Sequence, residues 1–133
     1  MLWARKAEQR EAKAKELAAL GLPVEPVADL EASARAADLI TCATLSHTPL
    51  IKGAWLKPGA HLDLVGAFTP DMRESDDEAV TRASLFCDTR AGALKEGGDL
   101  VIPLKAGIIS EASVKAELAD LARGRHKGRA NDQ

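Results

Sequence analysis

The apolar residues of this chain change their spacing along its length, from short continuous runs to the wider spacing of helices. Short apolar runs are typical of strands buried on both faces, as in parallel sheets. Segments rich in Ala, Glu, Lys, Arg and Leu are typical of helices. Because the two kinds of segment alternate, the sequence predicts an α/β fold, with a mainly parallel sheet and flanking helices.

Short apolar or alternating runs predict the extended segments. These are Met1–Ala4, Val24–Val27, Leu39–Thr44, His61–Val65 and Leu85–Cys87, with a turn over residues 57–60. Helix-forming composition and capping residues predict the helices. These cover residues 6–20, a short stretch capped by Asp29 or Ser33 and ending at Ala37, a helix beginning at Asp76-Asp77-Glu78, residues 90–95, and a last helix over residues 111–123 capped by Ser110. Gly97-Gly98 is expected to be a break.

Composition narrows the class of protein. The chain has 133 residues, the size of one domain, and 46% of them are hydrophobic but only 3% aromatic, so the core must be aliphatic. A net charge of −2 argues against nucleic acid or an anionic membrane as a partner. The basic residues from Arg123 to Arg129 are interpreted as a solvated helix end.

The two cysteines, Cys42 and Cys87, lie in apolar runs and are expected to be buried thiols in a reducing compartment. No segment approaches the roughly 18 apolar residues of a membrane helix, and the first residues lack a signal-peptide core. We therefore expect a cytoplasmic protein without a membrane partner. The spacing of His, Cys and acidic residues indicates no metal site.

Several short motifs occur in a characteristic order over roughly residues 37–129. They are Ala37-Asp38-Leu39-Ile40-Thr41-Cys42-Ala43-Thr44, Leu56-Lys57-Pro58-Gly59-Ala60-His61, Val65-Gly66-Ala67, Arg73-Glu74, Asp88-Thr89-Arg90, Gly98-Asp99-Leu100, Gly107-Ile108-Ile109, Glu117-Leu118 and Gly128-Arg129. In this order the chain resembles the nucleotide-binding domain of the ornithine cyclodeaminase/mu-crystallin family. The resemblance implies a Rossmann-like domain that binds NADP or NAD.

The family's opening strand and its glycine-rich turn, G-x-G-x-x-A/G, do not occur in the sequence. Amides of that turn hold the cofactor pyrophosphate. Residues 1–133 are thus expected to be a single partial NAD(P)-binding domain, cut at both ends. The resemblance further implies that the family's N-terminal substrate and dimerisation domain lies outside these residues, and the parent enzyme is expected to be a homodimer.

A missing first strand has a structural consequence, because that strand lies at the centre of the Rossmann sheet. We expect strands 2 to 6 to remain, with a vacancy in the middle. Three outcomes are possible: Met1–Ala4 pairs with Leu39–Ala43, a second chain fills the vacancy, or the domain is only marginally stable.

Arg5 follows the first extended segment, where an Arg accommodates the 2′-phosphate of NADP. Lys6 could add to this contact. The alternative is an exposed Arg at the start of a helix. Further cofactor-binding candidates follow two strands, at the edge where open α/β sheets bind ligands. They are Thr44, Leu45 and Ser46 after one strand and Val65, Gly66 and Ala67 after the next. Their alternatives are an ordinary turn and a tight strand exit.

Phe68 decides between two chemistries. The resemblance implies that ornithine cyclodeaminases carry an Asp here as the acid/base group, whereas a phenyl ring transfers no proton. Asp71 replaces a Gly of that motif and is a poor substitute. The sequence therefore favours an imine reductase acting on a cyclic imino acid, of the Δ1-pyrroline-2-carboxylate reductase or ketimine reductase type. Ornithine cyclodeaminase, which converts L-ornithine to L-proline and ammonia, and a non-catalytic remnant or small-molecule-binding module are the alternatives.

No residue of this chain is assigned a catalytic role. His47 and His61 lack a Cys or Ser partner at a recognisable spacing and are interpreted as structural or exposed. Asp99 is expected to organise a turn. Because the cofactor-holding turn is absent, we expect weak or no cofactor binding and no catalysis by this chain alone.

Overall fold

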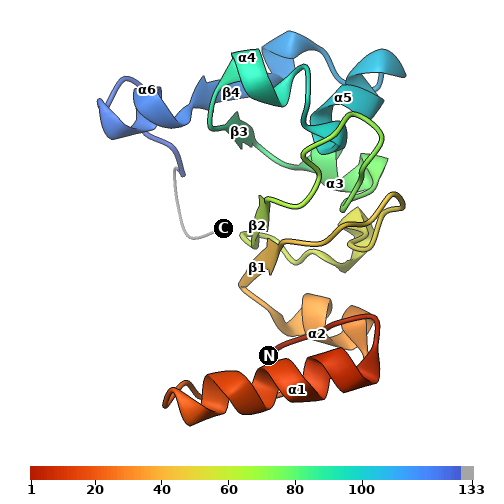
Figure 1. Cartoon of the computed structure of the whole chain (residues 1–133). Coiled ribbons are helices and arrows are strands. Elements are labelled where there is room, and N and C mark those ends of the chain that lie inside the picture. Colours follow the sequence, from red (N-terminus) through yellow and green to blue (C-terminus); the bar gives the residue numbers. More distant parts are fainter. Residues whose placement is uncertain (130–133) are drawn as a thin grey trace. The chain divides into compact units, whose positions relative to one another are not determined.

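The structure is a computed structural model that describes residues 1–129. The chain forms two compact units, Met1–Ala37 and Asp38–Gln133. Figure 1 shows short parallel strands together with helices, so the predicted α/β class is confirmed. That residues 1–133 form one partial domain stays a prediction.

The first unit contains α1 (Ala7–Ala19) and α2 (Leu30–Ala36). Both helices were predicted, and α1 ends just before Gly21, whose positive φ of 80° is typical of a residue that follows a helix. Of the two predicted caps for α2, the N-cap is Asp29, which accepts a hydrogen bond from the amide of Ala32.

The two extended segments of the first unit pair with each other. Leu2 forms an isolated parallel bridge with Pro26; its amide donates to Glu25 O at 2.8 Å and its carbonyl accepts from Val27 N at 2.9 Å. The backbone groups of Leu2 are therefore occupied within residues 1–27. The pairing of Met1–Ala4 with Leu39–Ala43 stays a prediction, because the two segments belong to different units.

The second unit contains two parallel strand pairs. β1 (Leu39–Cys42) pairs with β2 (His61–Leu64), and β3 (Leu85–Cys87) pairs with β4 (Val114–Glu117). Over residues 38–129, the described part of this unit, four α-helices and two 3-10 helices accompany the strands. They are α3 (Asp77–Arg82), α4 (Arg90–Ala93), α5 (Gly98–Lys105), α6 (Leu118–Ala122), η1 (Gly53–Trp55) and η2 (Glu111–Ser113).

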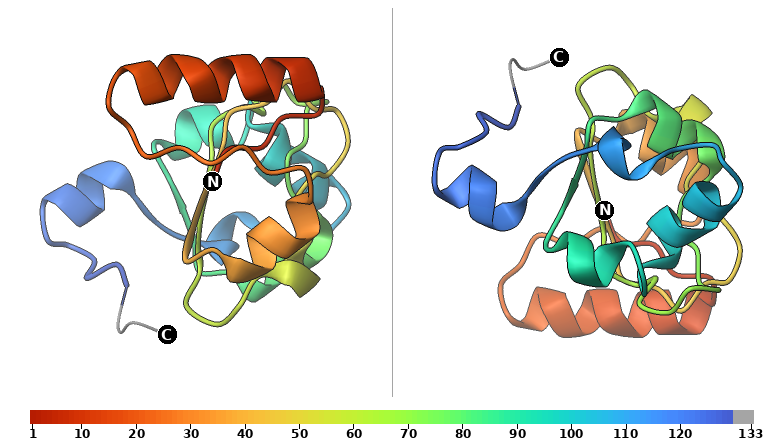
Figure 2. Two further views of the ribbon diagram at one scale, coloured as in Figure 1. Left: turned by 90° about the horizontal axis from the view of Figure 1, so that it is seen from below. Right: turned by 90° about the horizontal axis from the view of Figure 1, so that it is seen from above.

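The last predicted helix was wrong. Residues 111–123 form η2, β4 and α6 in succession, and Ser110 caps only η2. Within β4, Val114 and Ala116 are buried and Lys115 is exposed, which is the period of a strand. Pairing with β3 overrides the helix-forming composition of this segment. Both views of Figure 2 show α6 (blue) set apart from α3 and α5.

Helix α5 was also missed, because Gly97-Gly98 was interpreted as a break. Gly97 is instead the N-cap and Gly98 the first residue of the helix. A Cβ atom on Gly98 would lie 1.9 Å from Met72 O, so glycine is required by close packing there. Asp99 accordingly lies in the first turn of a helix and not in a turn of its own.

The buried apolar residues of the described chain are aliphatic or sulfur-containing, as the composition predicted. In the second unit they include Ile51, Met72, Val80, Val101 and Val114. Cys42 is buried, Cys87 is half-buried, and both thiols are free. Within residues 1–129 no helix combines the length and apolar character needed to cross a membrane.

Candidate functional site

The loops that follow β1 and β2 lie at one edge of the strand pair. The two strands are parallel and adjacent, and Val65 N donates to Cys42 O at 2.9 Å just beyond their last paired residues. Carboxyl ends of parallel neighbours meet at the same edge of a sheet. The structure therefore brings together six residues that the sequence singled out. These are Thr44, Leu45, Ser46, Val65, Gly66 and Ala67.

A single buried side chain joins these two loops. The Glu74 side chain is fully buried, with 0% of the residue exposed. Its Oε1 accepts a hydrogen bond from the amide of Thr44 at 2.6 Å, and its Oε2 accepts one from the amide of Gly66 at 2.7 Å. We call this pair of hydrogen bonds the Glu74 link. It satisfies two backbone donors and fixes one loop against the other.

Gly66 lies where no side chain fits. A Cβ atom at this position would lie 2.1 Å from Thr44 O and 2.3 Å from Glu74 Oε1. The space beside Gly66 is thus filled by the chain's own loop and carboxylate, which accounts for glycine at this position.

A second buried carboxylate holds the segment that carries Glu74. Asp99 of α5 accepts hydrogen bonds from the amide of Ser75 at 2.8 Å, from its hydroxyl at 2.9 Å and from the amide of Glu74 at 3.1 Å. Burial raises the pKa of Asp99, and the nearby charge of Glu74 raises it further. The hydrogen bonds from Ser75 and from the Glu74 amide lower this pKa but do not cancel the rise. Asp99 of α5 therefore holds the backbone of Glu74, and the carboxylate of Glu74 in turn holds the loops after β1 and β2.

The loops expose apolar side chains beyond this buried frame. Leu45, Val65 and Phe68 are 75%, 61% and 62% exposed. Ser46, by contrast, is buried, and its hydroxyl donates to Thr48 O at 2.7 Å within the same loop. The edge thus combines a polar, hydrogen-bonded interior with an apolar outer surface, which can contact a flat organic ring.

The position after Gly66-Ala67 carries no group that can transfer a proton. Phe68 is exposed, and Asp71, three residues on, accepts a hydrogen bond from the Thr69 hydroxyl at 2.6 Å. That hydrogen bond, with a backbone bond and the nearby His47, keeps the pKa of Asp71 below its usual range. A carboxylate that is already deprotonated at neutral pH is a poor proton donor.

The two histidines considered in the sequence lie in different settings. His47, in the loop after β1, lies next to Asp71, with Nδ1 3.1 Å from Oδ2. His61 is the exposed first residue of β2. The pair formed by His47 is exposed at both ends.

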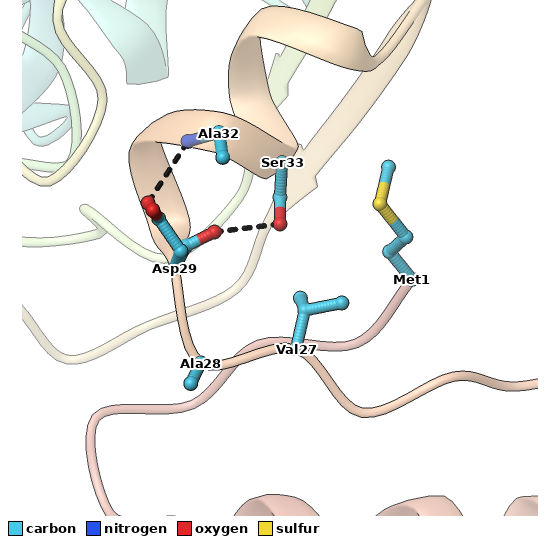
Figure 3. A pocket seen from close by; sticks show the side chains of 6 residues that line it. All are labelled: Met1, Val27, Ala28, Asp29, Ala32 and Ser33. Atoms are coloured by element: carbon cyan, nitrogen blue, oxygen red, sulfur yellow. Dashed lines mark hydrogen bonds between the residues drawn. The ribbon is translucent and has the colours of Figure 1, made fainter.

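Arg5 and Lys6 belong to the first unit. Both are exposed; Arg5 follows the Leu2 bridge segment and Lys6 is the N-cap residue of α1. The same unit has a shallow pocket, lined mainly by apolar side chains (Figure 3). Its one ionisable side chain, Asp29, caps α2 through Ala32, so the pocket offers no free acid or base.

Sequence reasoning missed the roles of Glu74 and Asp99. Arg73 belongs with them: its amide donates to Ser46 O at 2.7 Å, its Nε donates to Ser75 O at 2.7 Å, and its guanidinium pairs with Asp77. The available signal was the charged pair Arg73-Glu74, which is followed by Ser75 and the helix cap Asp76.

The comparisons with known proteins agree on the family. The family model described as "Ornithine cyclodeaminase/mu-crystallin family" matches residues 1–133. A Δ1-pyrroline-2-carboxylate reductase of Paracoccus denitrificans is 41% identical over 122 residues, which cover 92% of this chain and 39% of that protein.

Two solved structures resemble the fold closely. The Thermococcus litoralis Δ1-pyrroline-2-carboxylate reductase, in complex with NADH and L-proline, has a TM-score of 0.93 and 33% identity, covering 98% of this chain and 41% of its own. The iminosuccinate reductase of P. denitrificans, in complex with NAD+, has a TM-score of 0.86 and 32% identity, covering 98% and 39%. This chain thus spans about two fifths of the length of these three relatives, and it belongs to the ornithine cyclodeaminase/mu-crystallin family.

Proposed function

We propose that this chain is part of the nucleotide-binding domain of an NAD(P)H-dependent reductase that acts on a cyclic imino acid. The observation that carries the proposal is the similarity, with a TM-score of 0.93 over 98% of the chain, to a Δ1-pyrroline-2-carboxylate reductase bound to NADH and L-proline. The parallel arrangement of β1 and β2 supports it, since their carboxyl edge is where such folds bind ligands.

The residues at this edge fit one end of the cofactor better than the other. Exposed Leu45 and Val65 suit the nicotinamide side, where a flat ring needs apolar contacts. The amides of Thr44 and Gly66 already donate to Glu74, so they are not donors for the cofactor. The turn that would hold the pyrophosphate is absent from the sequence.

The chemistry needs little from this chain. Bound NADPH or NADH would supply a hydride to the carbon of a C=N bond, and a proton would go to the nitrogen. The residues of this edge would orient the ring and exclude water from it. Because Phe68 carries no proton-transferring group, the proton would come from another part of the enzyme or from solvent.

Phe68 also separates this proposal from ornithine cyclodeaminase, whose amine-to-imine step requires an acid/base group at that place. A non-catalytic module that only binds a small molecule is the further alternative. Full-length relatives distinguish the first two, by reduction of pyrroline carboxylate against release of ammonia from ornithine.

The test of the proposal is a titration of the isotope-labelled 133-residue chain with NADH and with NADPH up to millimolar concentration, followed by NMR. We expect weak binding, with the largest amide shifts in residues 43–46 and 65–68. The purified chain should not oxidise NADPH with Δ1-pyrroline-2-carboxylate, whereas the full-length P. denitrificans enzyme serves as the positive control. Shifts confined to other segments would contradict the proposed cofactor site, and turnover by the chain alone would contradict only its expected inactivity.

A further inference from the structure

We infer that Glu74 is a positioning residue, which fixes the loop after β1 and the loop after β2 in the relative position needed to contact the nicotinamide cofactor. The inference deepens the proposed function and rests on it. It assigns a role to a buried acid that touches no ligand itself.

The geometry of the Glu74 link supports this role. Thr44 lies 30 positions from Glu74 in the sequence, and Gly66 lies 8 positions from it. Each carboxylate oxygen of Glu74 accepts one backbone amide, at 2.6 Å from Thr44 and 2.7 Å from Gly66. Glu74 is fully buried, so water cannot replace either bond. No ladder hydrogen bond performs the same task beyond Val65 N to Cys42 O. Backbone bonds hold each loop to a different segment, Ser46 O to Arg73 N at 2.7 Å and Ala67 O to Gly98 N at 3.0 Å. Within residues 1–129 Glu74 is the side chain that bonds to both loops.

The backbone of Glu74 is itself held from two sides. Its carbonyl accepts the amides of Leu50 at 2.8 Å and Ile51 at 2.9 Å, and its amide donates to Asp99. The carboxylate is consequently fixed in place before any ligand arrives. A site whose contacts are held by such supporting hydrogen bonds loses less entropy on binding.

The loops that Glu74 joins carry the exposed apolar side chains of this edge. Leu45 follows Thr44 directly, and Val65 precedes Gly66. Moving one loop relative to the other separates these two side chains without unfolding either strand. We therefore expect loss of the link to weaken cofactor binding more than it weakens folding.

Glu74→Gln tests the inference, because an amide keeps the size of the side chain but replaces one acceptor by a donor. Only one of the two amides can then be satisfied. The matched control is Ser75→Ala, which removes an equally buried hydrogen bond to Asp99 and touches neither loop. Amide hydrogen exchange by NMR is measured for wild type and both variants under conditions where each is folded.

In Glu74→Gln we expect exchange at Thr44 or Gly66 to accelerate at least tenfold relative to the Val65 amide, with no such selective change in Ser75→Ala. Should Glu74→Gln not fold, Glu74→Asp, whose shorter side chain cannot span both amides, is measured in its place. Unchanged relative protection at both amides would overturn the inference.

A titration with NADH separates the inference from the proposed function. We expect Glu74→Gln to raise the Kd for NADH at least fivefold, with Ser75→Ala within twofold of wild type. Equal Kd values for Glu74→Gln and wild type, despite faster exchange at the loops, would overturn the positioning role. If NADH leaves the wild-type loops unperturbed, the proposed cofactor site is wrong. The positioning role of Glu74 is then wrong too, even where the exchange data show that the Glu74 link exists.

Discussion

The backbone of Thr44 occupies the space into which a side chain on Gly66 would project, with Thr44 O only 2.1 Å from the position of a Cβ atom. Gly66→Ala should therefore force apart the two loops at the carboxyl edge of β1 and β2. Overpacking of this kind costs about 3 kcal/mol of unfolding free energy. Urea denaturation followed by circular dichroism measures it.

Gly92→Ala is the control for this change. Its Cβ atom would meet only the Thr89 hydroxyl, at 3.2 Å, and alanine favours the helix α4 that contains it. We expect a change within about 1 kcal/mol. Equal destabilisation by both variants would show that the contact between Gly66 and Thr44 is not what requires glycine.

Asp76 should contribute more to stability than an ordinary helix cap. Its Oδ1 accepts the amide of Ala79 at 2.9 Å at the start of α3, and also the amide of buried Gly53 at 2.8 Å. Asp76→Ala should cost about 2–3 kcal/mol, against about 1 kcal/mol for Thr89→Ala, which removes a single cap from α4. Asp76→Asn keeps an oxygen and should recover most of the loss in urea denaturation. A similar loss in the Asn and Ala variants would contradict this account.

Asp99 should make the stability of the second unit fall as pH rises. Burial raises the pKa of Asp99 in the folded chain, so the unfolded chain releases this proton at a lower pH than the folded one does. Stability is therefore lost between the ordinary pKa of an aspartate and the raised value. The difference in unfolding free energy between wild type and Asp99→Asn, followed upward from about pH 3.9, should shrink across this window. A difference that grows with pH would contradict the predicted sign.

The two thiols should differ in reactivity. Burial, with the charges of Glu74, Asp99 and Asp63, raises the pKa of Cys42 to about 12, and the pKa of the half-buried Cys87 is raised by desolvation. Since the thiolate is the reactive form, Cys42 should carry roughly a thousandfold less of it at pH 8 than an ordinary cysteine. Iodoacetamide should label Cys87 first, as read by mass spectrometry, while denaturant should equalise the two sites. Faster labelling of Cys42 in the folded chain would be inconsistent with its burial.

Arg5 is proposed to select NADP, and its replacement tests this. Arg5→Asp should weaken binding of NADPH by about 10- to 150-fold, the equivalent of one charge-assisted hydrogen bond, and leave NADH binding nearly unchanged. Lys15→Asp, on the exposed part of α1, makes the same change in charge and serves as the control. Equal effects of the two variants on NADPH binding would indicate general electrostatics and not recognition of the 2′-phosphate.

Local spacing predicted most of the strands and helices correctly, because it depends on near neighbours in the chain. The apolar run Leu85–Cys87 became β3 with the predicted bounds, and Asp76 caps α3, which starts at Asp77. The same reasoning failed at Val114–Glu117. The composition of that segment suits a helix, and only the neighbouring edge of β3 makes it a strand.

The sequence by itself determined the α/β class, the family and the two loops that follow β1 and β2, since these depend on periodicity and on the order of short motifs. Only the tertiary structure decided that Glu74 joins those loops and that Asp99 supports it. The reason is physical: a buried carboxylate is stable only where distant backbone donors converge on it. Residues 44, 66, 74 and 99 come together only when the chain folds, and no periodic pattern in the sequence marks them.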